Sequence, residues 1–139
     1  MRRKVGREKA RRNREHGLKI ELKVKATPYP QPRPRVSRGH AYEPKRITDY
    51  KDEIRNKARS KMKNKEALSG LVRVEITLHR DKRLGSRSYG DIDNHVKAVL
   101  DALNGICYRD DAQVVKLAAE KKDTKEEYVE IIVTDELEE

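Results

Sequence analysis

Hydrophobic residues recur along the chain at two different spacings. In residues 18–24 and 72–78 they occupy every second position, and charged or polar residues fill the positions between them. This period of two predicts two strands, each with one buried face. Between Ile47 and Met62 the apolar residues instead recur three or four positions apart, with Lys and Arg elsewhere. That spacing predicts an amphipathic helix over about residues 47–64.

The second half of the chain continues this alternation of strand and helix. A second helix is indicated by four apolar residues that share one helical face: Val96, Val99, Leu100 and Leu103. Asn104-Gly105 is a typical C-terminal stop for it. Two further strands are expected at about residues 112–120 and 127–134. The order β-α-β-α-β-β over residues 17–139 predicts a single α+β domain, in which a mixed sheet of about four strands packs with two helices.

Three segments outside these elements are expected to lack regular structure. Prolines stand at every second residue from Pro28 to Pro34, which excludes a helix and favours an extended backbone. Residues 80–90 are polar and basic and contain glycine, so we expect a loop there. Residues 1–16 are strongly basic without an apolar period, which predicts a flexible N-terminal arm.

The net charge of +10 is distributed unevenly along the chain. Residues 1–90 carry 28 Lys and Arg against 10 Asp and Glu, whereas residues 91–139 carry 6 against 14. A basic body attracts phosphates, and a carboxylate-rich segment beside it suits an enzyme that holds a polyanion near metal ions. Two solubilising tails of opposite charge would give the same composition, so charge alone does not decide between these interpretations.

Composition disfavours several classes of protein. No apolar run reaches the roughly 20 residues that span a bilayer, and the basic start lacks the apolar segment of a secretory signal. A single cysteine, Cys107, cannot form an internal disulfide, so we expect a cytoplasmic protein without a membrane association. An RNA-directed function is disfavoured because the chain has no Phe or Trp for a stacking platform.

The candidate chemistry is concentrated in two short stretches. Asp91 and Asp93 stand two apart just before the second helix, so both side chains can point the same way. Lys97 follows one helical turn after Asp93 and could stabilise a phosphate. We expect the chain reversal after this helix to return Asp111 to the first two carboxylates. Clustered carboxylates repel one another without a cation and suit Mg²⁺, so the pattern predicts a metal site.

Each of these residues has a simpler interpretation when taken alone. Asp93 could cap the helix, Asp110-Asp111 could be an ordinary turn, and Lys97 could be a solvated helix lysine. His95 has no partner at metal-ligand spacing, which favours a surface or interface role over zinc. Cys107 is expected to be a small buried residue, because no Cys-His-Asp pattern surrounds it. The metal-site prediction therefore depends on the residues occurring together.

Residues 90–122 resemble the RusA-type Holliday junction resolvases, which are dimeric endonucleases of bacteria and their phages. The stretch reads GDIDNHVKAVLDALNGICYRDDAQVVKLAAEKK. It contains the family's Asp-x-Asp-Asn, a Lys one turn later, Asp-Ala-Leu-Asn, Asp-Asp and Gln-Val-Val, in that order. Residues 33–50, RPRVSRGHAYEPKRITDY, are similar to the family's Arg- and Pro-containing loop ahead of its first helix. The resemblance extends from about Lys19 to Val133.

The resemblance implies a structure-selective endodeoxyribonuclease that resolves four-way (Holliday) junctions in DNA recombination and repair. It implies a homodimer whose two sites make paired symmetric nicks and leave a 5′-phosphate and a 3′-hydroxyl. Mg²⁺ is the implied cofactor, with Mn²⁺ as an alternative, and its implied ligands are Asp91, Asp93 and Asp111. Lys97 is the implied catalytic lysine. A set of basic residues is implied to lie along bound DNA: Arg33, Arg35, Arg38, Lys45 and Arg46.

The rival interpretation is a non-catalytic nucleic-acid-binding protein, such as a phage regulator that retains a resolvase-like fold. Its basic arm and loop would contact the nucleic acid, and the carboxylates would be caps and turns. Both interpretations predict salt-sensitive binding, so Mg²⁺-dependent nicking is the property that separates them. Asp110 and Asp101 also match the motif, and the sequence leaves open whether either assists.

Overall fold

The computed structural model describes residues 18–32, 35–81 and 90–136. The predicted basic arm of residues 1–16 lies outside these ranges, as does most of the predicted loop of residues 80–90. Both therefore stay predictions.

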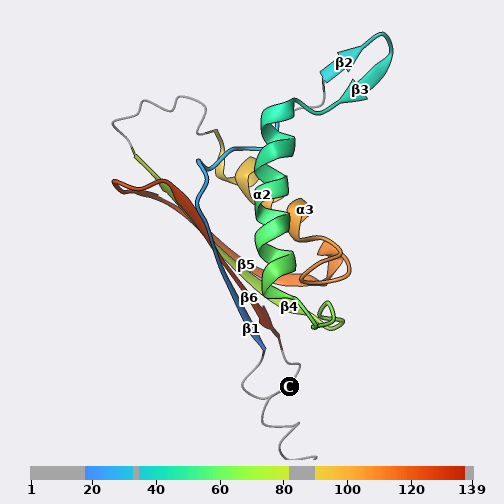
Figure 1. Cartoon of the computed structure of the whole chain (residues 1–139), viewed down its shortest axis with the longest axis vertical. Coiled ribbons are helices and arrows are strands. Elements are labelled where there is room, and N and C mark those ends of the chain that lie inside the picture. The colour runs from blue at the N-terminus through green and yellow to red at the C-terminus, as the bar shows by residue number, and fades with distance from the viewer. Residues whose placement is uncertain (1–17, 33–34, 82–89, 137–139) are drawn as a thin grey trace, which may run out of the picture.

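Four strands form one mixed sheet in the order β1-β6-β4-β5 (Figure 1). The strands are β1 (Lys19–Val24), β4 (Val72–Arg80), β5 (Val114–Asp123) and β6 (Tyr128–Asp135). β6 pairs antiparallel with both β1 and β4, whereas β4 and β5 run parallel. Because parallel neighbours cannot be joined by a tight turn, the chain returns from the end of β4 to the start of β5 through a crossover that contains a helix.

Two helices, α2 (Lys45–Lys61) and α3 (Ile92–Leu103), lie on the same side of the sheet (Figure 1). Each buries one face against it, and the inward-facing residues of β1, β4 and β6 complete a single core. Its fully buried side chains include Ile47, Ile54, Val74, Leu78, Val99 and Val133. The alternating and helical spacings of the sequence thus identify most of the core, although Leu18 at the start of the first pattern is 53% exposed.

Local chemistry explains where the helices begin and end. Pro44 directly precedes α2, where its missing backbone N–H removes no helical hydrogen bond. Arg59 and Lys61 in the last turn oppose the negative end of the helix dipole. Gly105 follows α3 with a φ of +81°, which is the left-handed conformation that commonly stops a helix.

A two-stranded hairpin, formed by β2 (Arg35–Ser37) and β3 (His40–Tyr42), is an element that the sequence pattern does not predict. It extends beyond the N-terminal end of α2 and away from the sheet (Figure 1). Arg38 and Gly39 form its turn, and both have positive φ, as a two-residue hairpin turn requires. Residues 28–32 form neither helix nor strand, which confirms that the prolines exclude a helix there.

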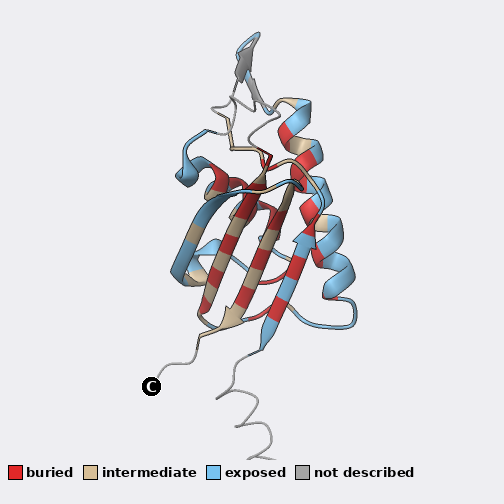
Figure 2. Cartoon of the chain, turned by 90° about the vertical axis from the view of Figure 1, so that its left-hand side faces the viewer, coloured by how far each residue is buried: buried red, intermediate tan, exposed pale blue. Residues whose placement is uncertain are grey.

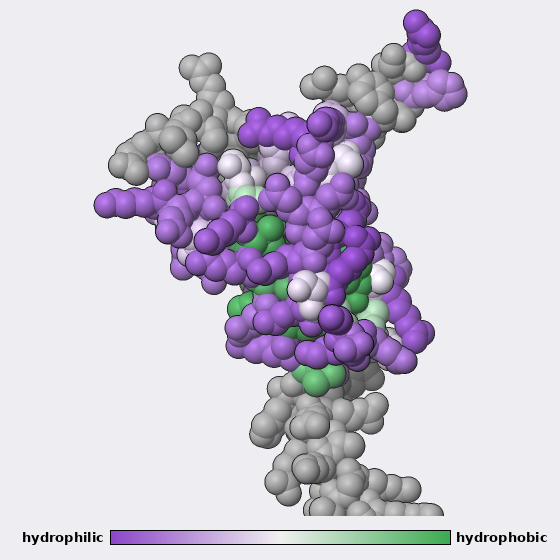
Figure 3. Space-filling model, in the orientation of Figure 1, coloured by the Kyte–Doolittle hydropathy of each residue, from purple (hydrophilic) through white to green (hydrophobic). Residues whose placement is uncertain are grey.

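β5 is the least covered strand of the sheet. It lies at one edge, and its side chains are exposed or half-buried along its whole length, whereas β4 and β6 alternate with buried positions (Figure 2). Two of its exposed residues are large and apolar, since Val115 is 49% exposed and Leu117 is 48% exposed. The face drawn in Figure 3 is by contrast mainly hydrophilic. No strand among the described residues pairs with the outer edge of β5.

The predicted fold class is confirmed. The domain is α+β, with two helices and a four-stranded mixed sheet in the order β-α-β-α-β-β, and the hairpin forms a separate small sheet. None of the helices in the described part of the chain is long and apolar enough to cross a membrane.

We expect Ile76→Ala to destabilise the domain strongly, because Ile76 is 1% exposed in the interior strand β4. Truncation of a buried Ile to Ala lowers the free energy of unfolding by about 2–5 kcal/mol. Thr77→Ala alters the opposite face of the same strand and should lower it by less than about 1 kcal/mol. Urea denaturation followed by circular dichroism measures both changes, and equal losses would contradict this assignment of the two faces of β4.

Candidate active site

The first two predicted metal ligands lie at the N-terminal end of α3. Asp91 occupies the N-cap position in an extended conformation, and its side chain makes no capping hydrogen bond. Asp93 lies in the first turn, where its Oδ1 accepts a hydrogen bond of 3.0 Å from the backbone N–H of Asn94. Both carboxylates are exposed and lie near the positive end of the helix dipole. Because Asp93 does not occupy the cap position, the capping alternative does not explain it, and both carboxylates are open to a cation.

Lys97 and Asp101 continue the same face of α3. Residues four apart on a helix lie one above the other, so Asp93, Lys97 and Asp101 form a charged stripe. Lys97 is exposed and therefore placed to reach a phosphate held near Asp93. Asp101 instead faces a partner on α2, since its Oδ2 lies 2.7 Å from Nζ of Lys51.

The end of β5 supports this end of α3. On β5, Nζ of Lys121 donates a hydrogen bond of 2.6 Å to the carbonyl oxygen of Gly90, directly before Asp91. His95 is completely buried in the first turns of α3. Its burial, and to a lesser extent nearby Lys121 and Arg80, lower the pKa of His95 to about 4, so its imidazole is neutral at pH 7.

His95 and Cys107 both belong to the interior. The expected surface or interface role of His95 is wrong, because it shares the buried face of α3 with Val99 and Ala102. Cys107 is buried as expected, and burial raises the pKa of its thiol to about 11. A protonated and inaccessible thiol is a poor nucleophile, which agrees with the prediction of a structural residue.

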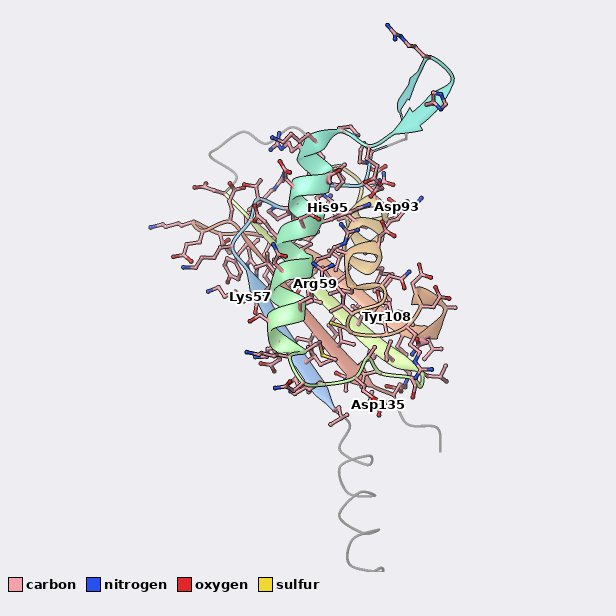
Figure 4. All side chains as sticks on the ribbon, turned by 45° about the vertical axis from the view of Figure 1, so that its right-hand side comes forward. Lys57, Arg59, Asp93, His95, Tyr108 and Asp135 are labelled. Carbon is pink, nitrogen blue, oxygen red and sulfur yellow. The ribbon has the colours of Figure 1, made fainter. Side chains whose placement is uncertain are left out.

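The third predicted ligand, Asp111, lies at the opposite end of α3. It opens the short 3₁₀ helix η3 (Asp111–Gln113), which directly precedes β5. The chain reversal before it stays close to α3, because the Tyr108 hydroxyl donates a hydrogen bond of 2.7 Å to the carbonyl oxygen of Leu100. Asp93 and Tyr108 mark the two ends of the helix in Figure 4. The 12 residues of α3 rise about 18 Å in total, so Asp111 is well separated from Asp93.

The expected return of Asp111 to the first two carboxylates therefore does not occur within one chain. Among the described residues, which include all of these aspartates, no three His, Cys, Asp or Glu side chains are grouped closely enough to hold a metal ion. The parallel pairing of β4 with β5 is the physical reason. α3 lies within the crossover between them, with Asp91 and Asp93 at its N-terminal end and Asp111 in the segment that follows its C-terminal end.

Gln113 fixes the turn before η3. Its Nε2 donates hydrogen bonds of 2.7 Å to the carbonyl oxygens of Leu68 and Gly70. Its Oε1 accepts hydrogen bonds of 2.8 and 2.9 Å from the backbone N–H groups of Arg109 and Asp110. One amide thus uses both donors and both acceptor positions to hold this turn against the segment before β4.

Three of the predicted DNA-binding residues lie at the tip of the hairpin or just after its second strand. Arg38 lies in the hairpin turn, Lys45 and Arg46 open α2, and all three are exposed. The segment before the hairpin passes beside the candidate carboxylates, because the backbone N–H of Gln31 donates a hydrogen bond of 2.9 Å to the carbonyl oxygen of Asn94. The side chains of the other two lie outside what the structure describes: Arg33 and Arg35.

Three supporting residues carry little signal in the sequence. Lys51 interrupts the apolar stripe of α2, and this interruption is the one local sign of a special role. Gln113 is part of the Gln-Val-Val motif, but the motif does not indicate what it binds. Lys121 has no local sign at all, because its partner Gly90 is 31 residues away in the chain.

Comparison with known proteins identifies a family for most of the domain. The family model described as Endodeoxyribonuclease RusA matches residues 25–134. The uncharacterized protein YqaN of Bacillus subtilis (strain 168) is 34% identical over 84 residues, which are 60% of this chain and 51% of that protein. The match thus spans about half the length of this relative.

We expect Gln113→Ala to lower the free energy of unfolding by roughly 1–2 kcal/mol, because two carbonyl oxygens and two N–H groups lose their partner. Gln113→Glu keeps the acceptor for Arg109 and Asp110 but places a carboxylate oxygen beside the carbonyl oxygens of Leu68 and Gly70. It should therefore also destabilise the domain. Thermal denaturation measures both variants, and unchanged midpoints would contradict the described role of Gln113.

Proposed function

The chain belongs to the RusA endodeoxyribonuclease family, and we propose from this premise that it is a Mg²⁺-dependent endonuclease that resolves four-way DNA junctions. The proposal rests on the exposed carboxylates of Asp91 and Asp93, which lie beside Lys97 and close to Gln31, four residues before the hairpin. Carboxylate oxygens are the hard ligands that Mg²⁺ prefers. Basic side chains around the hairpin supply the contacts that a phosphate backbone requires.

Each group has a distinct task in this proposal. Asp91 and Asp93 hold the cation at the N-terminal end of α3. Bound Mg²⁺ would neutralise phosphate charge and lower the pKa of a coordinated water. Lys97 stabilises the negative charge that develops on the scissile phosphate, acting as a point charge one helical turn away. The hairpin and the first turn of α2 orient the DNA so that the phosphate reaches the carboxylates.

One chain provides only two of the three predicted carboxylates at this position. Asp111 is separated from them by the length of α3, so it cannot join them without a large change of fold. We therefore propose that a second copy of the chain supplies the third carboxylate. This also assigns a role to the homodimer that the sequence resemblance implies.

The geometry of β5 suits such an exchange. In an antiparallel pair of identical strands, the start of one strand lies beside the end of the other. β5 starts two residues after Ala112, the neighbour of Asp111 in η3. Near the other end of β5, Lys121 donates a hydrogen bond to the carbonyl oxygen of Gly90, the neighbour of Asp91. Antiparallel pairing of β5 with β5 of a second copy would therefore bring Asp111 of each copy towards Asp91 of the other.

The exposed side chains at the β5 edge of the sheet support a second copy of the chain as its binding partner. Val115 and Leu117 are about half exposed on β5, and Ile92 at the start of α3 is 38% exposed. Burial of these apolar side chains would favour association. A twofold axis between two sites also matches the symmetry of a four-way junction, whose two strands must be nicked together.

We expect the protein to make paired symmetric nicks in a synthetic four-way junction only when Mg²⁺ is present, and to spare linear duplex of the same sequence. Asp93→Asn should slow nicking by at least on the order of 100-fold, because the variant loses a charged ligand that acts on the transition state. Its binding to the junction should persist in a gel-shift assay. Asp52→Asn, which removes an exposed carboxylate paired with Arg55 on α2, should nick at the normal rate. Tight binding without nicks, in Mg²⁺ or Mn²⁺, would favour the non-catalytic interpretation instead.

A mixture of two inactive variants distinguishes a shared site from a site within one chain. When Asp93→Asn and Asp111→Asn chains form a mixed dimer, a shared arrangement gathers both substitutions in one site and leaves the other intact. Half of randomly formed dimers are mixed, so we expect roughly a quarter of the normal nicking rate, confined to single strands. Sites within one chain would give no recovery.

In the matched control, the two arrangements predict the opposite outcomes for the mixed dimer. A chain with both substitutions, paired with an unmodified chain, leaves no intact site in a shared arrangement but one intact site if each chain works alone. Co-refolding followed by the junction-nicking assay measures both mixtures. Wild-type dimers make up about a quarter of the second mixture, so a shared site predicts roughly a quarter of the normal rate and sites within one chain predict roughly half. A rate near one half would overturn the shared site.

A further inference from the structure

A buried lysine lies between the hairpin and the helix that carries the candidate carboxylates. Lys51 is on α2, and its side chain is 1% exposed. It interrupts the apolar stripe between Ile47 and Ile54. Removing an ammonium group from water is unfavourable unless it is paired, so filling the core does not explain a lysine at this position.

Lys51 is paired with two carboxylates from different parts of the chain. Its Nζ lies 3.0 Å from Oε1 of Glu43 and 2.7 Å from Oδ2 of Asp101. Glu43 directly follows the hairpin, and Asp101 lies on α3. The hydrogen bond from Lys51 is the main reason why the pKa of Glu43 is lowered, so Glu43 stays ionised near neutral pH. A single lysine thus connects the end of the hairpin to α3.

Gln31, four residues before the hairpin, is bonded both to Glu43 and to α3. Nε2 of Gln31 donates a hydrogen bond of 3.1 Å to Oε1 of Glu43, the oxygen that Lys51 also binds. The backbone N–H of Gln31 binds the carbonyl oxygen of Asn94, next to Asp93. The contacts therefore form a closed circuit that connects Gln31, before the hairpin, and Glu43, directly after it, to α3.

We propose that Lys51 is a positioning residue that sets the direction of the hairpin relative to Asp93 and Lys97. The inference rests on the proposed nuclease function, and it adds a determinant of where the strand is cut. Apolar neighbours already hold α2 against α3, whereas the lysine adds two directional bonds, and buried ion pairs often contribute geometry rather than stability. DNA bound by the hairpin then presents one phosphodiester bond to the carboxylates instead of several neighbouring bonds.

Three variants on α2 test this role. Lys51→Met fills the same space without either ion pair, and Lys51→Arg retains the charge and both partners. Lys57→Met is the matched control, because Lys57 is an exposed lysine on the same helix and its loss changes the net charge equally (Figure 4). Circular dichroism verifies folding. If Lys51→Met does not fold, Asp101→Asn replaces it, because this substitution weakens the same bridge from its half-exposed end.

The first measurement needs no nuclease activity. Hydrogen exchange at the Gln31 amide, followed by NMR, reports whether the hairpin stays fixed to α3, because this N–H binds Asn94. We expect Lys51→Met to speed this exchange at least about tenfold through local opening. Lys57→Met should leave it unchanged, and Lys51→Arg should restore most of the protection.

The second measurement maps the nicked bonds along one arm of a junction at single-nucleotide resolution. We expect the wild type and Lys57→Met to cut mainly one bond and Lys51→Met to spread its cuts over neighbouring bonds. In Lys51→Met, kcat should fall several-fold while KM changes less than about twofold, because the hairpin still binds DNA but aims it poorly. Lys51→Arg should return the narrow pattern.

Two results would overturn the inference. Unchanged Gln31 exchange in Lys51→Met would show that the lysine does not hold the hairpin. Faster exchange with an unchanged cut pattern would show that the contact does not aim the DNA. If the wild type itself cuts no junction, the proposed function fails, and the exchange measurement still decides whether Lys51 fixes the hairpin.

Discussion

The parallel pairing of β4 with β5 determines where the candidate carboxylates lie. Two parallel strands require a connection that returns along the full length of the sheet, and α3 makes this return. The N-terminal end of α3 therefore carries Asp91 and Asp93, and the turn that follows its C-terminal end carries Asp111. Lys121 fixes the first end and Gln113 fixes the second, so the hydrogen bonds of the domain hold the aspartates apart.

The sequence predicts the elements well where one face of each is buried. The helix expected at 47–64 is Lys45–Lys61, and its stripe packs into the core as the spacing indicates. The hairpin escapes prediction for a physical reason, because strands of three residues are too short to show a period and Arg38-Gly39 is not a typical hairpin turn. Burial of His95 could be anticipated from its position on the apolar face of α3, but not from metal-ligand spacing.

The candidate site also has residues that the sequence predicts and supporting contacts that it does not. The motif predicts Asp91, Asp93, Lys97 and Asp111 as site residues, because these residues stand close together in the sequence. What supports them depends on contacts between distant segments, such as Lys51 with Asp101, which are 50 residues apart. The separation of the carboxylates is also invisible in the sequence, since residue spacing does not encode the order or direction of strands. Only the folded topology shows that one helix keeps them apart.

The division of the carboxylates between the two ends of α3 has a consequence for how such an enzyme is controlled. With the proposed shared site, a monomer has an incomplete set of metal ligands and no nuclease activity. The specific activity would then rise steeply with protein concentration until pairs dominate, by mass action alone. The nuclease activity would then have a threshold in protein concentration. Newly made chains would not cleave DNA until their concentration was high enough for dimers to form.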